Sequence, residues 1–213
     1  MGRYHAILFD MDGTLLDTLT DMQDAVNHVL AAHRLPLRTL EEVRRFVGNG
    51  AGPLIHRALP EGYPREQEVL EEYRAYYQAH NCIRTCPYLG IPELLEQLRQ
   101  RGLKLAVVSN KPDETTRTLA ARFFPGLAAL GQRDGIPSKP APEMVWSAME
   151  QLGVDARHAL YVGDSEVDVE MAHRAGLPLA AVAWGFRGRR LLEQAGARCI
   201  VDTVPELLAV ATE

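Results

Sequence analysis

The sequence has few cysteines, no long apolar run and no excess of basic residues. Three cysteines, Cys82, Cys86 and Cys199, form an odd set without the companion ligands of a zinc site, so we expect reduced thiols. No segment approaches the roughly 18 apolar residues of a membrane span, and no leader pattern precedes the first apolar run. With a formal charge of −5, the sequence lacks the excess of Lys and Arg that is typical of nucleic-acid-binding proteins. These absences predict a cytoplasmic protein without nucleic-acid or membrane partners.

The remaining composition is that of a globular enzyme. Hydrophobic residues make up 46% and charged residues 24% of the chain, which excludes disordered and collagen-like classes. A length of 213 residues suits one core domain with a small second unit. The oligomeric state stays open between a monomer and a homodimer.

Short apolar runs alternate with helical patterns along most of the chain. Such runs are typical of parallel strands that are covered on both faces. The predicted strands are 4–9, 103–108, 160–162, 179–182 and 199–201, and the helices between them are 93–101, 142–152 and 168–175. The alternation predicts an α/β fold with a doubly wound parallel sheet, in which ligands bind beyond the carboxyl ends of the strands.

The interval from residue 17 to residue 85 offers helices without strands. Apolar residues keep helical spacing from Leu19 to Leu30, Thr39 and Glu42 form a capping-box pattern, and a further helix is predicted at 64–80. We predict a core domain of residues 1–16 and 86–213. A small α-helical cap of residues 17–85 is inserted into it after the first strand.

The loop after the first predicted strand carries the pattern Asp10-Met11-Asp12-Gly13-Thr14. One carboxylate can attack a phosphorus atom while the other handles the proton of the leaving group, and a divalent cation can offset their repulsion. Thr14 offers a hydroxyl and an amide to a phosphate. An acidic surface turn is the alternative, because Asp-Gly is a common turn pair. The full pattern after an apolar strand favours catalysis.

Two further loops carry groups that bind phosphate. Ser109 and Asn110 follow the strand at 103–108 and can donate to a phosphoryl oxygen, although a serine at this place is also a common helix cap. Lys139 precedes the helix at 142–152 and can offset negative charge on a carboxylate and a phosphate, although most lysines are solvated.

The fourth loop, Gly163 to Asp168, follows the strand at 160–162 and supplies Asp164 and Asp168. Carboxylate oxygens are the ligands that Mg²⁺ prefers, and the same residues also suit a capped helix start. An acid pair, a serine, a lysine and a second acid pair, each at a strand end, together predict a phosphoryl-transfer site with Mg²⁺ as cofactor.

These motifs, in this order, resemble those of the haloacid dehalogenase superfamily over essentially the whole chain. The resemblance implies that Asp10 is a nucleophile that forms an aspartyl-phosphate. It implies that Asp12 protonates the leaving group and then activates water, while Ser109 and Lys139 hold the phosphoryl group. Superfamily members that cleave carbon–halogen bonds lack the second aspartate, so Asp12 disfavours dehalogenation.

The same resemblance implies a magnesium site. Its ligands are Asp10, the main-chain oxygen of Asp12 and the Asp164 carboxylate, with Asp168 close by. We therefore assign Asp10, Asp12, Asp164 and Asp168 to the metal site, with the direct or indirect role of Asp168 left open.

The insertion resembles the lid that selects the substrate in this superfamily. Its loop at Gly48-Asn49-Gly50 is similar to that of phosphoglycolate phosphatases, although on its own it reads as a tight helix connection. The resemblance predicts a small anionic phosphate ester, 2-phosphoglycolate first. The expected substrate-binding residues are Thr14, Asn110, Gly48, Asn49 and Gly50. Arg45 and Arg57 flank this loop and can bind a substrate carboxylate, although arginines on amphipathic helices usually face solvent. Arg187 follows the strand at 179–182, at the mouth of the predicted site, where it can contact the substrate.

Other activities stay as alternatives. The chain also resembles beta-phosphoglucomutases, so a phosphosugar mutase or a sugar-phosphate phosphatase is the second hypothesis. Phosphonate cleavage requires a cap lysine, and the first lysine in the chain is Lys104, outside the cap. A binding protein without turnover predicts a damaged acid pair, and Asp10 and Asp12 are both intact.

Overall fold

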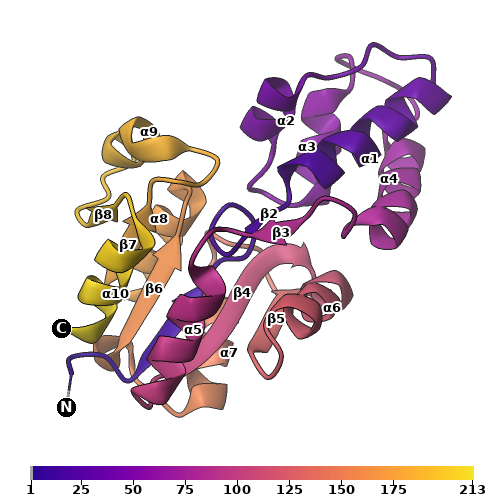
Figure 1. The fold of residues 1–213 in the computed structure, drawn as a ribbon. Helices are drawn as coiled ribbons and strands as arrows, with labels where there is room; N and C mark the ends of the chain where they lie inside the picture. The colour runs from indigo at the N-terminus through magenta and orange to yellow at the C-terminus, as the bar shows by residue number, and fades with distance from the viewer. Residues whose placement is uncertain (1) are drawn as a thin grey trace.

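The computed structural model describes residues 2–213 and contains a six-stranded parallel sheet in the order β5-β4-β1-β6-β7-β8 (Figure 1). Its strands are β1 Ala6–Phe9, β4 Lys104–Pro112, β5 Ala128–Gln132, β6 Ala159–Gly163, β7 Leu179–Val182 and β8 Ile200–Val201. The central strand β1 pairs with β4 on one side and β6 on the other. The chain crosses from one side of β1 to the other between β5 and β6, which places the switch point at β1. The predicted α/β parallel fold is confirmed.

Helices cover both faces of this sheet. Ile7 and Phe9 of β1 join one buried apolar cluster and Leu8 joins another, because successive side chains point to opposite faces. The first cluster lies under α5 Ile91–Gln100, α6 Asp113–Phe123 and α10 Val204–Thr212, and the second under α7 Glu143–Leu152 and α8 Glu166–Ala175. The short helix α9 Gly188–Gln194 follows β7. Burial on both faces explains why β1 reads as a continuous apolar run.

A separate group of helices forms the cap. The helices α1 Leu19–Ala32, α2 Leu40–Phe46, α3 Ala51–Ala58 and α4 Glu66–His80 share an apolar cluster of their own. They stand together beyond one end of the sheet (Figure 1). The Thr39 hydroxyl accepts from the Glu42 amide and the Glu42 carboxylate accepts from the Thr39 amide, so the predicted capping box at α2 is confirmed. Helix α3, which begins inside the glycine-rich loop, was not predicted.

Two short strands connect the cap to the core. β2 Leu16–Asp17 and β3 Cys86–Pro87 are antiparallel, with Asp17 opposite Cys86. The buried carboxylate of Asp21 accepts hydrogen bonds from the amides of residues 83–85 at 2.9 to 3.1 Å, which ties α1 to the returning chain. The cap boundaries at residues 17 and 85 stay a prediction, which this pairing at the neck supports.

No helix within residues 2–213 has both the length and the apolarity that crossing a membrane requires. All three cysteines, Cys82, Cys86 and Cys199, are free thiols.

Candidate active site

The acidic loop begins where β1 ends. The Asp10 amide donates to the Val162 carbonyl of β6 at 2.8 Å, so the sheet pairing continues up to the first carboxylate. Asp10 is 9% exposed, and one of its carboxylate oxygens accepts from the Met11 amide at 2.7 Å. The Asp12 carboxylate instead accepts from the Thr18 hydroxyl at 2.7 Å, at the entrance to the cap. The two aspartates therefore present their carboxylates to different neighbours.

Lys139 joins the acidic loop to the fourth motif. Its Nζ lies 2.9 Å from Asp10 Oδ1 and 2.8 Å from Asp168 Oδ1, and it donates to the Tyr161 hydroxyl at 3.0 Å. Burial lowers the pKa of Lys139, but Asp10 and Asp168 outweigh burial and raise it well above its usual range. The ammonium is therefore charged, buried and held in one place.

The Asp168 carboxylate contacts a protein partner through each of its oxygens. Its Oδ2 accepts from the Ser165 hydroxyl at 2.6 Å and completes a capping box at the start of α8. Its other oxygen faces Lys139. A Cβ at Gly163 would lie 2.4 Å from Asp168 Cγ, so only glycine fits beside this carboxylate. These contacts support a positioning role for Asp168.

Asp164 is buried in a space that two glycines leave open. Its Oδ2 accepts from the Phe186 amide at 2.7 Å, and its Oδ1 accepts from the Thr14 hydroxyl at 3.3 Å. A Cβ added at Gly13 would lie 2.3 Å from Asp164 Oδ2, and one added at Gly185 would lie 2.3 Å from Asp164 Cβ. The Asp-Gly motif thus allows the close approach of a carboxylate, and the sequence analysis did not identify the matching role of Gly185.

Asp10, Asp164 and Asp168 form a buried group whose carboxylate oxygens lie within 4.8 Å of one another. Burial raises the pKa of Asp10 to about 7 against the opposing charge of Lys139, and burial also raises that of Asp164 well above its usual range. One ammonium therefore serves a site with three carboxylates. A divalent cation would supply the missing positive charge and prefers such hard oxygen ligands. The group fits Mg²⁺.

The second motif lies within β4. Ser109 is 2% exposed and reaches the same pocket as Asp10. The Asn110 side chain donates to the carbonyls of Lys139 at 3.0 Å and Gly48 at 3.2 Å, and it accepts from the Lys139 amide at 2.7 Å. Asn110 thus links the Lys139 loop to the cap loop.

Lys111 is a site residue that the sequence analysis missed. Its Nζ lies 3.2 Å from Asp12 Oδ2 and donates at 2.8 Å to the hydroxyl of Tyr77 on α4. Its side chain is 3% exposed, and its ammonium lies 4.5 Å from the centre of the Tyr77 ring. No local sequence signal marks this burial, because the covering tyrosine belongs to the cap. The contact connects Asp12 to the cap.

The predicted substrate-binding residues divide into two groups. Gly48 and Gly50 line the pocket together with Asn110. Asn49 and Thr14 are not among the residues that line it. The Asn49 side chain accepts from Arg57 at 3.0 Å, and the Thr14 hydroxyl contacts Asp164. We interpret Thr14 as orienting Asp164 and Asn49 as shaping the cap loop.

Arg187 joins the core to the cap loop. Its guanidinium donates to the carbonyls of Arg44 at 2.8 Å and Val47 at 2.6 Å and pairs with Glu166 at 2.7 Å. A Cβ at Gly48, where φ is +117°, would lie 2.9 Å from this guanidinium. The glycine therefore permits the close approach. Arg45, by contrast, is exposed and pairs with Glu41.

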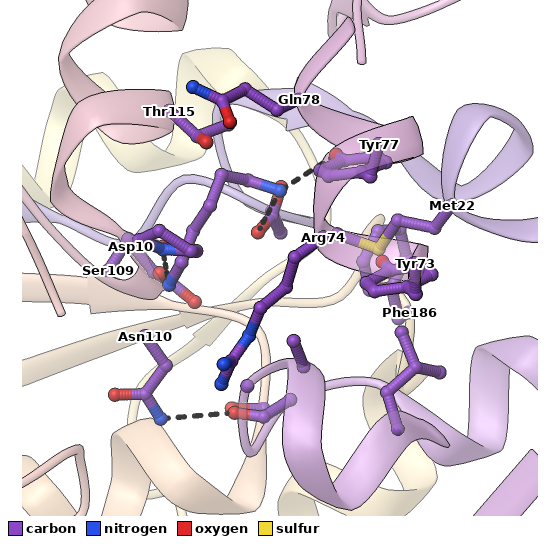
Figure 2. A pocket seen from close by; sticks show the side chains of 18 of the residues that line it. Asp10, Met22, Tyr73, Arg74, Tyr77, Gln78, Ser109, Asn110, Thr115 and Phe186 are labelled. Atoms are coloured by element: carbon purple, nitrogen blue, oxygen red, sulfur yellow. Dashed lines mark hydrogen bonds and ion pairs between the residues drawn. The ribbon is translucent and has the colours of Figure 1, made fainter. Parts of the chain in front are cut away.

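A cavity of about 230 Å³ lies between the cap and the carboxyl ends of the strands (Figure 2). Its core side carries Asp10, Asp12 and Ser109. Its apolar lining comes from Met22, Leu54 and Tyr73 of the cap and from Phe186, a core residue that packs into the cap cluster. A polar reaction site thus faces an apolar wall, as in many sites for small organic ligands.

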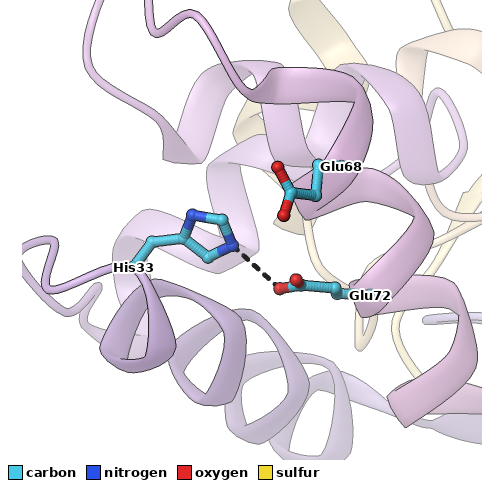
Figure 3. A group of neighbouring side chains, drawn as sticks. All are labelled: His33, Glu68 and Glu72. Atoms are coloured by element: carbon cyan, nitrogen blue, oxygen red, sulfur yellow. Dashed lines mark hydrogen bonds and ion pairs between the residues drawn. The ribbon is translucent and has the colours of Figure 1, made fainter.

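A second group of acidic and histidine side chains lies in the cap, away from this cavity (Figure 3). The ring nitrogens of His33 lie 2.9 Å from the Tyr63 hydroxyl and 2.8 Å from a Glu72 oxygen. Glu68 is paired with Arg65 at 2.7 Å. Because each member has a protein partner, the group is explained as a link between the end of α1 and α4.

The comparisons with known proteins agree with this geometry. Residues 7–182 match the family of haloacid dehalogenase-like hydrolases. The chain is 34% identical to a phosphoglycolate phosphatase of Pseudomonas savastanoi over 95% of this chain and 78% of that protein. It is 37% identical to the N-acetylmuramic acid 6-phosphate phosphatase of Pseudomonas aeruginosa over 98% of this chain and 95% of that protein.

Solved structures give the same result. A candidate phosphoglycolate phosphatase from Lactobacillus delbrueckii superimposes with a TM-score of 0.95 at 37% identity, covering 100% of this chain and 99% of that one. CbbY from Rhodobacter sphaeroides, solved in complex with phosphate, matches with a TM-score of 0.75 at 25% identity and 96% coverage of both chains. The chain therefore belongs to the haloacid dehalogenase-like hydrolases, and within that family it is similar to phosphoglycolate phosphatases.

Proposed function

We propose that this family phosphatase hydrolyses a small carboxylate-bearing phosphate ester with the aid of Mg²⁺, and that Asp10 is its nucleophile. The observation that carries the proposal is the meeting of Asp10, Lys139 and Asp164 at the central strand end, beneath the cap cavity. Ionised carboxylates are nucleophiles in known phosphoryl-transfer enzymes, and positioned charges stabilise the transferred group.

In the proposed reaction, an Asp10 oxygen attacks phosphorus and the bond from phosphorus to the ester oxygen breaks. Asp12 gives its proton to the departing alkoxide, so an alcohol leaves and an aspartyl-phosphate remains. Asp12 then takes a proton from water as that water attacks phosphorus, which releases inorganic phosphate and regenerates Asp10.

The other residues hold the transferred group. Ser109 donates to a phosphoryl oxygen, and Lys139 offsets negative charge at Asp10 and the phosphate. Asp10, the Asp12 main-chain oxygen and Asp164 would hold Mg²⁺, which when bound would supply electrostatic stabilisation of the developing negative charge. Asp168 keeps Lys139 in place.

The leading substrate is 2-phosphoglycolate. The named relatives support it, and so does the cap loop at Gly48 to Gly50, which lines the cavity through its glycines. A second candidate is N-acetylmuramic acid 6-phosphate, because the relative with that activity matches this chain over nearly its full length. The apolar wall of the cavity offers a surface for the larger organic part of such an ester. Both candidates carry a phosphate and an acid group.

The test is phosphate release from p-nitrophenyl phosphate, 2-phosphoglycolate and N-acetylmuramic acid 6-phosphate, each with and without Mg²⁺. Wild type is compared with Asp10→Asn, which keeps the size of the side chain. We expect release that requires both Mg²⁺ and Asp10, with a loss of about 10⁴-fold or more in the variant. Undiminished turnover by Asp10→Asn, or no turnover of any ester, would refute the proposal.

A further inference from the structure

Three cationic side chains line the cavity, and two of them already have protein partners. Lys111 lies 3.2 Å from an Asp12 oxygen, and Arg187 lies 2.7 Å from a Glu166 oxygen. The third is Arg74 of α4. In the part of the chain that the structure describes, residues 2–213, the Arg74 guanidinium has neither an ion-pair partner nor a hydrogen bond. Arg74 is thus the cation of the cavity whose charge is available to a ligand.

The Arg74 side chain is extended from α4 into the cavity (Figure 2). Its neighbours on α4 in the same lining are Tyr73 and Tyr77, whose rings are buried. Arg74 itself is exposed, as is Gln78 one turn further along α4, so the guanidinium meets solvent until a ligand covers it. A guanidinium also matches the two oxygens of a carboxylate with a pair of parallel donors.

The core side of the cavity already provides for the phosphate. Lys139 and the carboxylate group that fits Mg²⁺ lie at the strand ends, whereas Arg74 belongs to the opposite, cap side. The cavity lining also includes the carboxylates of Asp12, Asp164 and Glu114, which would repel a second anionic group of an ester. Such a group therefore needs a cation beside it. Arg74 is the side chain placed to supply that cation.

We propose that Arg74 binds the carboxylate of the substrate and thereby selects phosphate esters of acids over esters that lack an acid group. The inference rests on the proposed function and deepens it, because it names the residue that recognises the feature shared by both candidate substrates. Arg74 is a specificity-determining residue and takes no part in the bond changes at phosphorus.

Glu114 offers a competing explanation for Arg74. It is exposed, lies in the first turn of α6 and lines the same cavity without pairing with Arg74 within the described residues 2–213. If Arg74 acted by pairing with Glu114 when the cap closes, its loss would lower the turnover of every ester by a similar factor. The two roles are therefore separable by the choice of substrate.

The experiment uses matched pairs of esters that differ in the acid group. The first pair is 2-phosphoglycolate and 2-hydroxyethyl phosphate, and the second is N-acetylmuramic acid 6-phosphate and N-acetylglucosamine 6-phosphate. Wild type should prefer the acid in at least one pair. In Arg74→Ala the ratio of kcat/KM for the acid over its neutral partner should fall by roughly 10- to 100-fold, mainly through KM. Arg74→Lys should restore part of this ratio.

Arg45→Ala is the matched control, because Arg45 is another exposed cap arginine that pairs with Glu41 outside the cavity. It should leave both ratios unchanged. An equal loss for acid and neutral esters in Arg74→Ala, or a wild type with no preference for the acid in either pair, would overturn the inference while the phosphatase proposal stands. No Mg²⁺-dependent release even from p-nitrophenyl phosphate would instead refute the proposed function, and the inference with it.

Discussion

The core and the cap face the same cavity but hold their polar side chains in different ways. On the core side, Lys139 has three buried partners, and Asp164 packs against Gly13 and Gly185, where there is no room for a Cβ. On the cap side, Arg74 has no partner among residues 2–213. A group that acts on phosphorus must be fixed before the substrate arrives, because reorganising it would cost transition-state stabilisation. A group that recognises a substrate must have its hydrogen bonds free.

The comparison predicts that removing the core cation Lys139 has a larger effect than removing any charged side chain of the cap. Lys139→Met should lower kcat/KM for p-nitrophenyl phosphate by about 10³-fold, because the charge beside Asp10 is lost. It should also lower the free energy of unfolding by about 3–5 kcal/mol, since buried carboxylates are left without their counterion. Chemical denaturation and kinetics measure both. Lys104→Met, at an exposed lysine, is the control, and equal effects in the two variants would contradict the comparison.

A pair of glycine variants compares the two regions directly. Gly185→Ala places a Cβ 2.3 Å from Asp164 Cβ, whereas Gly52→Ala on α3 meets no atom within 4 Å. The first should lower stability by about 1–3 kcal/mol and remove the increase in Tm caused by Mg²⁺. The second should be neutral or stabilising by up to about 1 kcal/mol, because alanine favours a helix over glycine. Thermal unfolding with and without Mg²⁺ would show a reversed order if the core were the more tolerant region.

The buried carboxylates at the strand ends predict that the stability of the metal-free protein falls as the pH rises. The pKa of Asp10 is raised to about 7 in the folded state, from about 3.9 in an unfolded chain. Between these values the folded state binds more protons than the unfolded state, so stability is highest at the acidic end and falls as pH rises. We expect the contribution of Asp10 to Tm to decrease by about 2–4 °C per pH unit in this window.

Thermal unfolding in a chelator from pH 4.5 to pH 7.5 measures this slope. Asp10→Asn is the control, because an amide cannot titrate, and the slope should be smaller in this variant. Mg²⁺ should raise the Tm of wild type more at pH 7.5 than at pH 5, since the cation competes with the proton for the same oxygens. A slope that Asp10→Asn leaves unchanged would show that other groups cause it.

The smallest predicted change in kcat/KM is for Arg187, which connects the core to the cap loop. Arg187→Ala removes the donors to the Arg44 and Val47 carbonyls at the cap loop, and it changes no residue to which the proposed reaction assigns a role at phosphorus. We expect a loss of about 10-fold in kcat/KM with a nearly unchanged rate at saturating substrate, because cap placement and not chemistry is weakened. A fall in kcat alone would place Arg187 in the chemistry of the core.

The sequence predicted the core better than the cap. The motifs of the core follow strands whose burial on both faces gives continuous apolar runs, and parallel strand ends meet at one edge. Asp10, Ser109, Lys139 and Asp164 are indeed brought together there. The strand β5 was missed because Ala128–Gln132 contains small and polar residues and only one large apolar side chain.

The remaining site residues could not be predicted, because their environment comes from distant parts of the chain. Lys111 is buried by Tyr77 of the cap, and Gly185 is required by the position of Asp164. Arg74 is the one arginine of α4 Glu66–His80, and nothing in its local sequence distinguishes it from the other arginines of the cap. Only the orientation of α4 over the strand ends distinguishes it. The capping box at Thr39 was predictable because it depends on residues within one turn.

The paired strands β2 and β3 have a consequence for how such enzymes can change. Asp17 and Cys86 are paired, so the two ends of the inserted segment are held side by side. The entropic cost of closing the loop between them grows only slowly with its length, so insertions of different size are tolerated. The helical cap can therefore be replaced by another inserted unit on the same β2–β3 pair without disturbing β1, the strand that positions Asp10.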